Sequence, residues 1–315
     1  MRYAVISDIH GNLPGLKAVL EDAEKAGAEG YIFAGDYCLS GPFPDECISL
    51  LKGIENKHII RGNEEGYLDR LKNSDPALWT DGQMQISYWC CRNVSEDNLS
   101  YLAALPARAD FVCGGVPVHI AHSSEAFIGN STPDICVSSA FAKKYENITL
   151  TREKLAEEIK AACDGHAALN KAVNSLENGV YIFGHTHIQW NYKAQGKDVY
   201  LLNPGSCGLP LDGVTNSLPY ALLDISEGGE VSIEQKRVPF DTAKYTEALK
   251  TTSQYREANV WSRVIIRELT TAREHLQFFL NFAEEYANRI GDSERPFSVE
   301  TWENAHAEWE KSQGN

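Results

Sequence analysis

Seven side chains that suit a divalent cation stand at the ends of five short apolar runs in the sequence. They are Asp8, His10, Asp36, Asn63, His122, His185 and His187. Imidazole nitrogens mixed with carboxylate and amide oxygens suit Mn, Fe or Zn better than Ca. A lone histidine at a strand end, such as His122, is more often structural, but its place in an ordered set favours a metal centre.

The apolar runs that carry these residues predict buried strands. They cover residues 4–6, 31–35, 58–62, 116–121 and 180–184. Between the first two runs, Leu13, Leu16 and Val19 recur at helical spacing until Gly27. Strand, loop, helix and strand in that order predict a parallel sheet, and open α/β sheets gather ligands at the carboxyl ends of their strands.

The ordered motifs Asp8-x-His10, Gly35-Asp36, Gly62-Asn63, His122 and Gly184-His185-x-His187 resemble the signature of the calcineurin-like metallophosphoesterases. The likeness extends over about residues 1–240. It is closest to the small bacterial phosphodiesterase branch, because Gly11-Asn12 and Asn203-Pro204-Gly205-Ser206 are also present. The resemblance implies an α/β fold: a four-layer α-β-β-α sandwich of two packed mixed sheets flanked by helices, here with a C-terminal helical extension.

The resemblance also implies a ligand set for two divalent metal ions. One ion is held by Asp8, His10, Asp36 and His187, and the other by Asp36, Asn63, His122 and His185. Asp36 bridges the two ions, which share a hydroxide that attacks phosphorus. We expect Mn²⁺, with Fe, Zn and Ni as alternatives.

Further residues are candidates for catalysis and substrate binding. Asp36, Asn63 and Glu64 are the catalytic candidates, and Asn12, Arg61 and Ser206 are the candidate phosphate contacts; a structural salt bridge is an equal alternative for Arg61. Glu64 departs from the family pattern, in which many members carry a histidine thought to assist the leaving group. It is either a general acid, if like charges raise its pKa, or a spectator or extra metal ligand, which we favour.

Three functions remain open at this stage. The first is a dinuclear phosphodiesterase that hydrolyses small phosphodiesters or nucleotides; the second is a phosphomonoesterase or protein phosphatase. The third is a non-catalytic metal-binding interaction scaffold, which the complete ligand set disfavours. We expect the phosphodiesterase, because a monoester carries more negative charge and is less welcome beside the added carboxylate of Glu64.

Composition narrows the partners and the cellular location. The chain has 315 residues, 43% of them hydrophobic, and a formal net charge of -15, which disfavours an extended nucleic-acid surface. Eight cysteines without a Cys-x-x-Cys pair are typical of a reduced protein. The first residues enter a strand directly and no apolar run approaches about 18 residues, so we expect a cytoplasmic protein without a membrane partner.

We expect two parts in the chain: a catalytic domain over residues 1–240 and a helical extension over 241–315. Residues 123–178 are either a helical insertion at the rim of the metal centre or ordinary crossover helices. In the extension, 260–286 is a candidate for one long helix and 299–309 for another. This part packs either against the main domain or against a second subunit, which makes a homo-oligomer through the C-terminal helices a candidate assembly.

Overall fold

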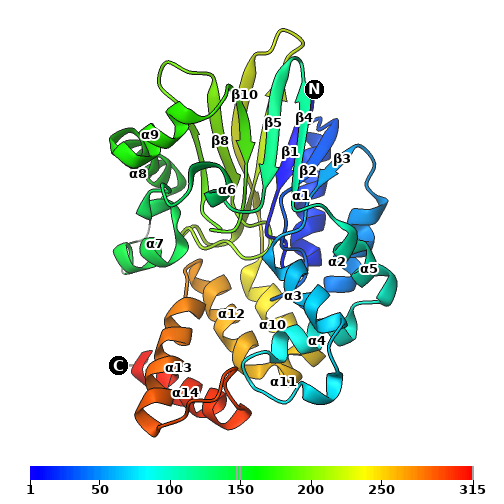
Figure 1. Ribbon diagram of the computed structural model, residues 1–315, viewed down its shortest axis with the longest axis vertical. Coiled ribbons are helices and arrows are strands. Elements are labelled where there is room, and N and C mark those ends of the chain that lie inside the picture. The colour runs from blue at the N-terminus through cyan, green and yellow to red at the C-terminus, as the bar shows by residue number, and fades with distance from the viewer. Residues whose placement is uncertain (147, 149, 314–315) are drawn as a thin grey trace.

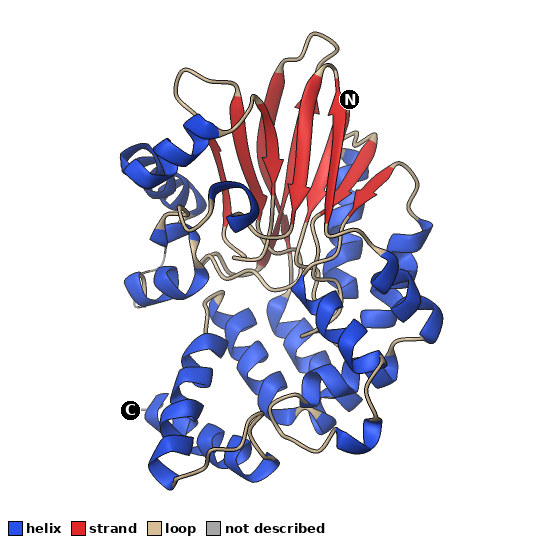
Figure 2. Ribbon diagram, in the orientation of Figure 1, coloured by secondary structure: helices blue, strands red, loops and turns tan. Residues whose placement is uncertain are grey.

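A computed structural model describes residues 1–146, 148 and 150–313. Two five-stranded sheets pack face to face, with helices on their outer sides (Figure 2). The first sheet has the order β10-β9-β1-β2-β3, and its strands are β1 (Arg2–Ile6), β2 (Gly30–Phe33), β3 (Lys57–Ile59), β9 (Ser217–Ile225) and β10 (Val231–Pro239). The second has the order β4-β5-β6-β8-β7, with β4 (Arg108–Cys113), β5 (Val116–Ala121), β6 (Gly179–Ile182), β7 (Gln189–Lys193) and β8 (Val199–Pro204). The predicted α/β sandwich is confirmed.

Both sheets are mixed, and their parallel parts place the metal-type residues. β1, β2 and β3 run parallel in the first sheet, and β5, β6 and β8 run parallel in the second. Val5, Ile32, Ile120 and Ile182 are fully buried where the two sheets meet. Because the sheets share this apolar interface, the carboxyl ends of their parallel strands come to one end of the sandwich.

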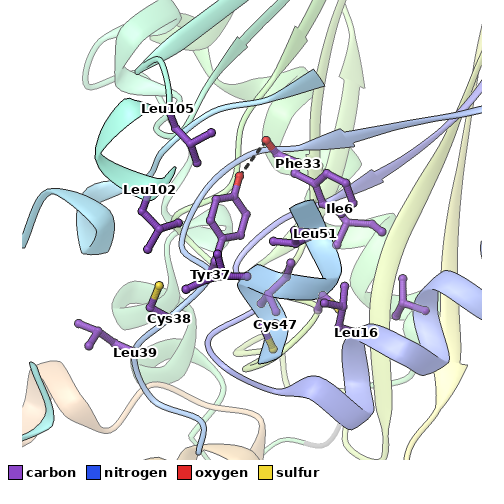
Figure 3. Close-up of a cluster of buried hydrophobic side chains, with 14 of the residues drawn as sticks. Ile6, Leu16, Phe33, Tyr37, Cys38, Leu39, Cys47, Leu51, Leu102 and Leu105 are labelled. Atoms are coloured by element: carbon purple, nitrogen blue, oxygen red, sulfur yellow. Dashed lines mark hydrogen bonds between the residues drawn. The ribbon is translucent and has the colours of Figure 1, made fainter. Parts of the chain in front are cut away.

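Helices of the first half cover the outer face of the first sheet. They are α1 (Leu13–Lys25), α2 (Pro44–Gly53), α3 (Asn63–Lys72), α4 (Gln85–Asn93) and α5 (Glu96–Ala104), with a short 3-10 helix η1 (Pro76–Leu78). Figure 3 shows this core, in which Leu16, Leu51 and Leu102 from three helices surround Ile6 and Phe33. The apolar positions Leu16 and Val19, predicted from their helical spacing, therefore form the inward face of α1.

The long connection between β5 and β6 is mainly helical. It contains α6 (Glu125–Ile128), a 3-10 helix η2 (Asp134–Cys136), α7 (Ser138–Lys144), α8 (Arg152–Gly165) and α9 (Ala167–Ser175). Ile159 and Leu169 from α8 and α9 share one buried cluster with Trp190 and Leu201 of the second sheet. These helices thus supply the outer layer of that sheet, and the limits 123–178 of an insertion stay a prediction.

The last described stretch is helical throughout its regular structure. It contains α10 (Thr242–Leu249), α11 (Ser253–Glu257), α12 (Asn259–Thr271), α13 (Leu276–Ile290) and α14 (Val299–Gln313). Figure 1 places these helices below the sandwich, on the side of the strand ends. Within the described ranges, no helix combines the length and the apolar composition needed to cross a membrane.

The prediction of one long helix over 260–286 is wrong. α12 ends where Ala272 adopts a left-handed conformation with φ 49°, and α13 begins at Leu276. The carboxylate of Glu268 accepts the backbone N–H groups of His275 and Leu276, both within 2.8 Å, and so satisfies donors at the start of α13. Apolar spacing continues across the break, so periodicity alone did not reveal it.

Candidate metal centre

The predicted ligands meet at the carboxyl ends of the parallel strands. We call Asp8, His10 and His187 the inner group and Asp36, His122 and His185 the outer group; within each, potential ligand atoms lie within 4.8 Å of one another. Asn63, the seventh predicted ligand, places its Oδ1 3.0 Å from Nδ1 of His185. Asp36 also forms a third such group with His10 and Glu64, so it lies between the inner and outer groups. Whether these residues hold metal stays a prediction.

Five of the six charged or imidazole ligands have a left-handed backbone. Asp8, His10, Asp36, His185 and His187 all have φ between 50° and 70°. This region is uncommon for residues other than glycine, although Asp and His tolerate it better than most, and such conformations concentrate at functional sites. These turns change the direction of each side chain just after a strand ends. Ligands two positions apart on one loop, such as Asp8 and His10, can therefore both point into the centre.

Glycine precedes three of the ligands, Asp36, Asn63 and His185, because the loops approach closely. A Cβ atom at Gly62 would lie 2.1 Å from Oδ1 of Asp36, and one at Gly184 would lie 2.3 Å from Oδ2 of Asp8. No side chain fits at such distances. The Gly-Asn and Gly-His steps of the sequence therefore allow a ligand loop from one strand to contact the carboxylate of another.

Hydrogen bonds fix the ring nitrogen that each buried histidine presents. Nδ1 of His10 lies 3.2 Å from the Leu39 carbonyl oxygen, and Nδ1 of His187 lies 2.8 Å from that of Leu209. Nδ1 of His122 similarly lies 2.7 Å from the carbonyl oxygen of Ala34. Because a carbonyl only accepts, each Nδ1 carries a proton, and each Nε2 of a neutral ring offers a lone pair.

The lone pairs on these Nε2 atoms face those of another imidazole or of a carboxylate oxygen. A cation between them would attract both, so the arrangement fits a cation site. The Nε2 atoms of His10 and His187 are 3.0 Å apart. Nε2 of His122 is buried without a hydrogen-bond partner in the described structure, although it lies 3.1 Å from Oδ2 of Asp36. Such contacts are repulsive unless a positive charge lies between the atoms. The donor types and their convergence therefore fit divalent metal ions.

The pKa directions show the same need for positive charge. Burial raises the pKa of Asp8, but His187 and then the other imidazoles lower it further, so the net direction is down. Burial lowers the pKa of His122, yet the adjacent Asp36 carboxylate raises it to about 10. The carboxylates thus stay ionised and attract a cation, which is either a proton on His122 or a metal ion in its place.

Glu64 lies behind His10 rather than at an open position. Its Oε1 is 3.1 Å from Nδ1 of His10, and its Oε2 accepts the N–H of Leu39 at 3.0 Å. Burial, Asp36 and Glu65 raise the pKa of Glu64 well above its ordinary value. This place suits a group that orients His10 or joins the ligands, and its role in catalysis stays a prediction.

The three predicted substrate contacts occupy different environments. The Asn12 side chain accepts the Gly15 N–H and donates to the Gly208 carbonyl, which makes it the N-cap of α1. Ser206 donates to the Asp8 carbonyl at 2.7 Å and accepts the Leu209 N–H. Both side chains are buried and hold loops together. Arg61 is half-buried, and in the described part of the chain its guanidinium has no hydrogen bond or ion pair, so it is the one available for an anion.

Glu65 is a structural residue that sequence reasoning missed. Its carboxylate accepts N–H groups from Gly62 at 2.7 Å, Tyr37 at 2.8 Å and Asp36 at 3.1 Å, and so ties the Asp36 turn to the start of α3. A glutamate three residues after the N-cap is the signature of a capping box. Likewise, Asn12 before Leu13-Pro14 has the pattern of an N-cap followed by proline.

One exposed ligand distinguishes the two groups, because Asp36 and His122 of the outer group are as buried as the inner ligands. Asp8, His10 and His187 are each at most 8% exposed, whereas His185 is exposed and Asn63 is half-buried. Partial burial and the neighbouring His122 lower the pKa of His185, which favours the neutral ring that can bind a cation. A substrate therefore has access to the outer group.

Known proteins share this fold and sequence pattern. The calcineurin-like phosphoesterase superfamily domain matches residues 1–228. An uncharacterized protein of Methanocaldococcus jannaschii is 28% identical over 247 residues, which cover 78% of this chain and 90% of that protein.

Two solved structures share the fold. A metallophosphoesterase from Sphaerobacter thermophilus has 22% identity and a TM-score of 0.56, over 86% of this chain and 100% of that one. A hypothetical protein from Pyrococcus horikoshii has 18% identity and the same TM-score, over 87% and 99% of the two chains. Placement in the small bacterial phosphodiesterase branch stays a prediction. Because the superfamily domain matches well over half of the sequence, the chain belongs to the calcineurin-like phosphoesterase superfamily.

Proposed function

We propose that this protein is a dinuclear metal-dependent phosphodiesterase that hydrolyses small phosphodiester or nucleotide substrates. The observation that carries the proposal is the junction of two ligand groups at Asp36, one fully buried and the other with one exposed ligand, His185. Mn²⁺ is the expected metal, with Fe, Zn and Ni as alternatives. When bound, two such ions supply a Lewis-acid clamp for the phosphate and acidify the attacking water.

The protein's own residues then have separate tasks. Asp36 contributes oxygens toward both groups, and the backbone N–H of Glu64 donates to its Oδ1 at 3.0 Å and holds it in place. Asn63 and His185 stand on the open side, where an incoming phosphate contacts them first. Arg61 comes two residues before Asn63, and its guanidinium, which has no partner among the described residues, is the candidate phosphate contact.

Charge balance favours a diester over a monoester. Four buried carboxylates surround the centre, those of Asp8, Asp36, Glu64 and Glu65. Two divalent ions bring about four positive charges, which these carboxylates offset when the bound ions keep them ionised against the burial that raises the pKa of Glu64 and of Glu65. A site that is nearly neutral attracts a dianionic monoester less than an unbalanced cationic site would, and it tolerates the single charge of a diester.

The test is a substrate panel with controlled metal content. Protein stripped with a chelator and reloaded with Mn²⁺ is assayed on bis(p-nitrophenyl) phosphate, p-nitrophenyl phosphate and a dinucleotide. We expect metal-dependent hydrolysis with a higher kcat/KM on the diesters. A preference for the monoester would make the protein a phosphatase, and bound metal without hydrolysis on any substrate would favour the interaction scaffold. Cytoplasmic location and assembly through the C-terminal helices stay predictions.

A further inference from the structure

The C-terminal extension contacts the two loops that orient the inner histidines. Residues 39–41 carry the Leu39 carbonyl that fixes His10, and residues 207–213 carry the Leu209 carbonyl that fixes His187. Both loops face α10 and α12. The extension contributes no predicted ligand, yet it covers the loops that orient two predicted ligands, His10 and His187.

The first contact is a buried hydrogen bond from the extension to residue 40. The amide Nε2 of Gln254, in α11, donates to the Ser40 carbonyl oxygen at 2.7 Å, and Gln254 is fully buried. Ser40 has φ 90°, a backbone conformation that serine rarely adopts. A strained residue persists only where its surroundings hold it, and Gln254 is the side chain from the extension that does so here.

The strain at Ser40 is coupled directly to His10. The φ angle of Ser40 describes rotation about its N–Cα bond. The nitrogen of that bond belongs to the same peptide group as the Leu39 carbonyl. A relaxation of Ser40 to a negative φ would turn that carbonyl away from Nδ1 of His10. The next residue reinforces the link, because the Gly41 N–H donates to the His10 carbonyl at 2.6 Å.

The second contact is apolar and lies beneath the other loop. Leu209 and Leu211 pack with Tyr245 of α10 and with Ile265 and Leu269 of α12 in one buried cluster. The narrow space bounded by His10, Leu209 and these helices leaves no room for a water molecule. The loop that bears the Leu209 carbonyl, the partner of His187, therefore rests on the extension itself.

We propose that the C-terminal extension is a positioning element of the metal centre, with Gln254 as the positioning residue that holds His10 in its ligand orientation through Ser40 and Leu39. The proposal rests on the proposed metal-dependent function. Partners that only orient a metal ligand commonly change metal affinity by roughly 10- to 100-fold. Gln254 acts one step further away, so we expect the lower end of that range.

The experiment compares two variants that each remove one tether of the extension. Gln254→Met keeps the side-chain length but loses the donor to Ser40. Ser253→Ala is the matched control: it removes the hydroxyl that accepts the N–H of the Trp89 indole at 3.1 Å, a bond that ties the same helix to α4 rather than to a ligand loop. Calorimetric titration of the metal-free proteins with Mn²⁺ gives affinity and stoichiometry, and thermal unfolding gives stability.

We expect Gln254→Met to bind Mn²⁺ about tenfold more weakly than Ser253→Ala does, with kcat largely recovered at saturating Mn²⁺. Equal Mn²⁺ affinity in the two variants would overturn the proposal. If Gln254→Met does not fold, Gln254→Asn, which keeps the amide but shortens its reach, is judged by the same criterion. Wild-type protein that binds no Mn²⁺ would overturn the metal centre itself, whereas normal binding in wild type and both variants would overturn only the role of Gln254.

Discussion

The inner and outer ligand groups use the same kinds of side chain but are supported in different ways. The inner histidines are buried, and their carbonyl partners lie on loops that the C-terminal extension covers. In the outer group, His122 bonds to the carbonyl of Ala34, which follows β2 of the first sheet, and the exposed His185 bonds to the side chain of Asn63. This difference suits the inner group to retain an ion and the exposed His185 side of the outer group to admit a substrate.

The largest effect is expected where the two groups join. Asp36→Asn should lower turnover more than about a hundredfold, because changes to groups that merely orient a ligand already cost up to about that factor. The fold should survive, since the amide is isosteric with the carboxylate. Turnover and metal content are compared with Asp45→Asn, a carboxylate that bonds Ser95 and Asn98 away from the centre. Near-normal turnover in Asp36→Asn would show that the groups work independently.

Replacing one histidine in each group by alanine should show whether the inner group retains its ion while the outer group gives access to substrate. His185→Ala should lose the outer ion, keep the inner one and reduce activity by about tenfold or more. His187→Ala should instead release the inner ion and also lower thermal stability, because it leaves a buried gap and an unpaired Leu209 carbonyl. Metal content per chain and thermal unfolding distinguish these results. Identical metal loss in both variants would remove the distinction between the groups.

A smaller effect is expected at Glu64, which supports the inner group from behind. Glu64→Gln keeps the size but removes the charge beside Nδ1 of His10, so Mn²⁺ affinity should fall about tenfold. The loss of activity at limiting Mn²⁺ should be equal for aryl and alkyl diesters. A loss confined to alkyl leaving groups would instead identify Glu64 as the general acid, because an activated phenolate departs without help.

The smallest effect concerns the pH dependence of the extension. Burial, with Arg267 and Arg273, lowers the pKa of His275 from 6.5 to about 4, while Glu274 and the buried Glu268 lie on the same turn. Between pH 6.5 and 4 the unfolded chain binds this proton and the folded chain does not, so the contribution of His275 to stability is lost as pH falls. His275→Asn should therefore flatten stability in that window. Denaturant unfolding at pH 7 and pH 5 measures the change, and an unaltered pH slope would contradict it.

The sequence predicted what depends on local pattern. Apolar runs followed by Asp or His identified the strand ends, and the parallel sheets then brought these ends together. Ser95 followed by the acidic Glu96 has the pattern of a helix N-cap, and at the start of α5 its hydroxyl accepts the N–H of Asn98. Motif order supplied the family. Each of these signals lies within a few residues of the feature that it predicts.

Features that depend on distant contacts could not be read from the sequence. Ser206 follows a family motif, but its bond to the Asp8 carbonyl joins residues 198 positions apart. The break after α12 depends on the carboxylate of Glu268 folding back onto the start of α13. Gln254 gave no signal at all, since a lone glutamine in a helical stretch has no pattern that points to Ser40.

Electron paramagnetic resonance of the Mn²⁺-loaded protein tests the central claim most directly. Two Mn²⁺ ions that share the Asp36 carboxylate should be magnetically coupled, and the fully loaded wild type should show the spectrum of an exchange-coupled pair. His185→Ala should show the signal of a single isolated ion. An uncoupled spectrum from wild type at full loading would contradict a dinuclear centre joined at Asp36.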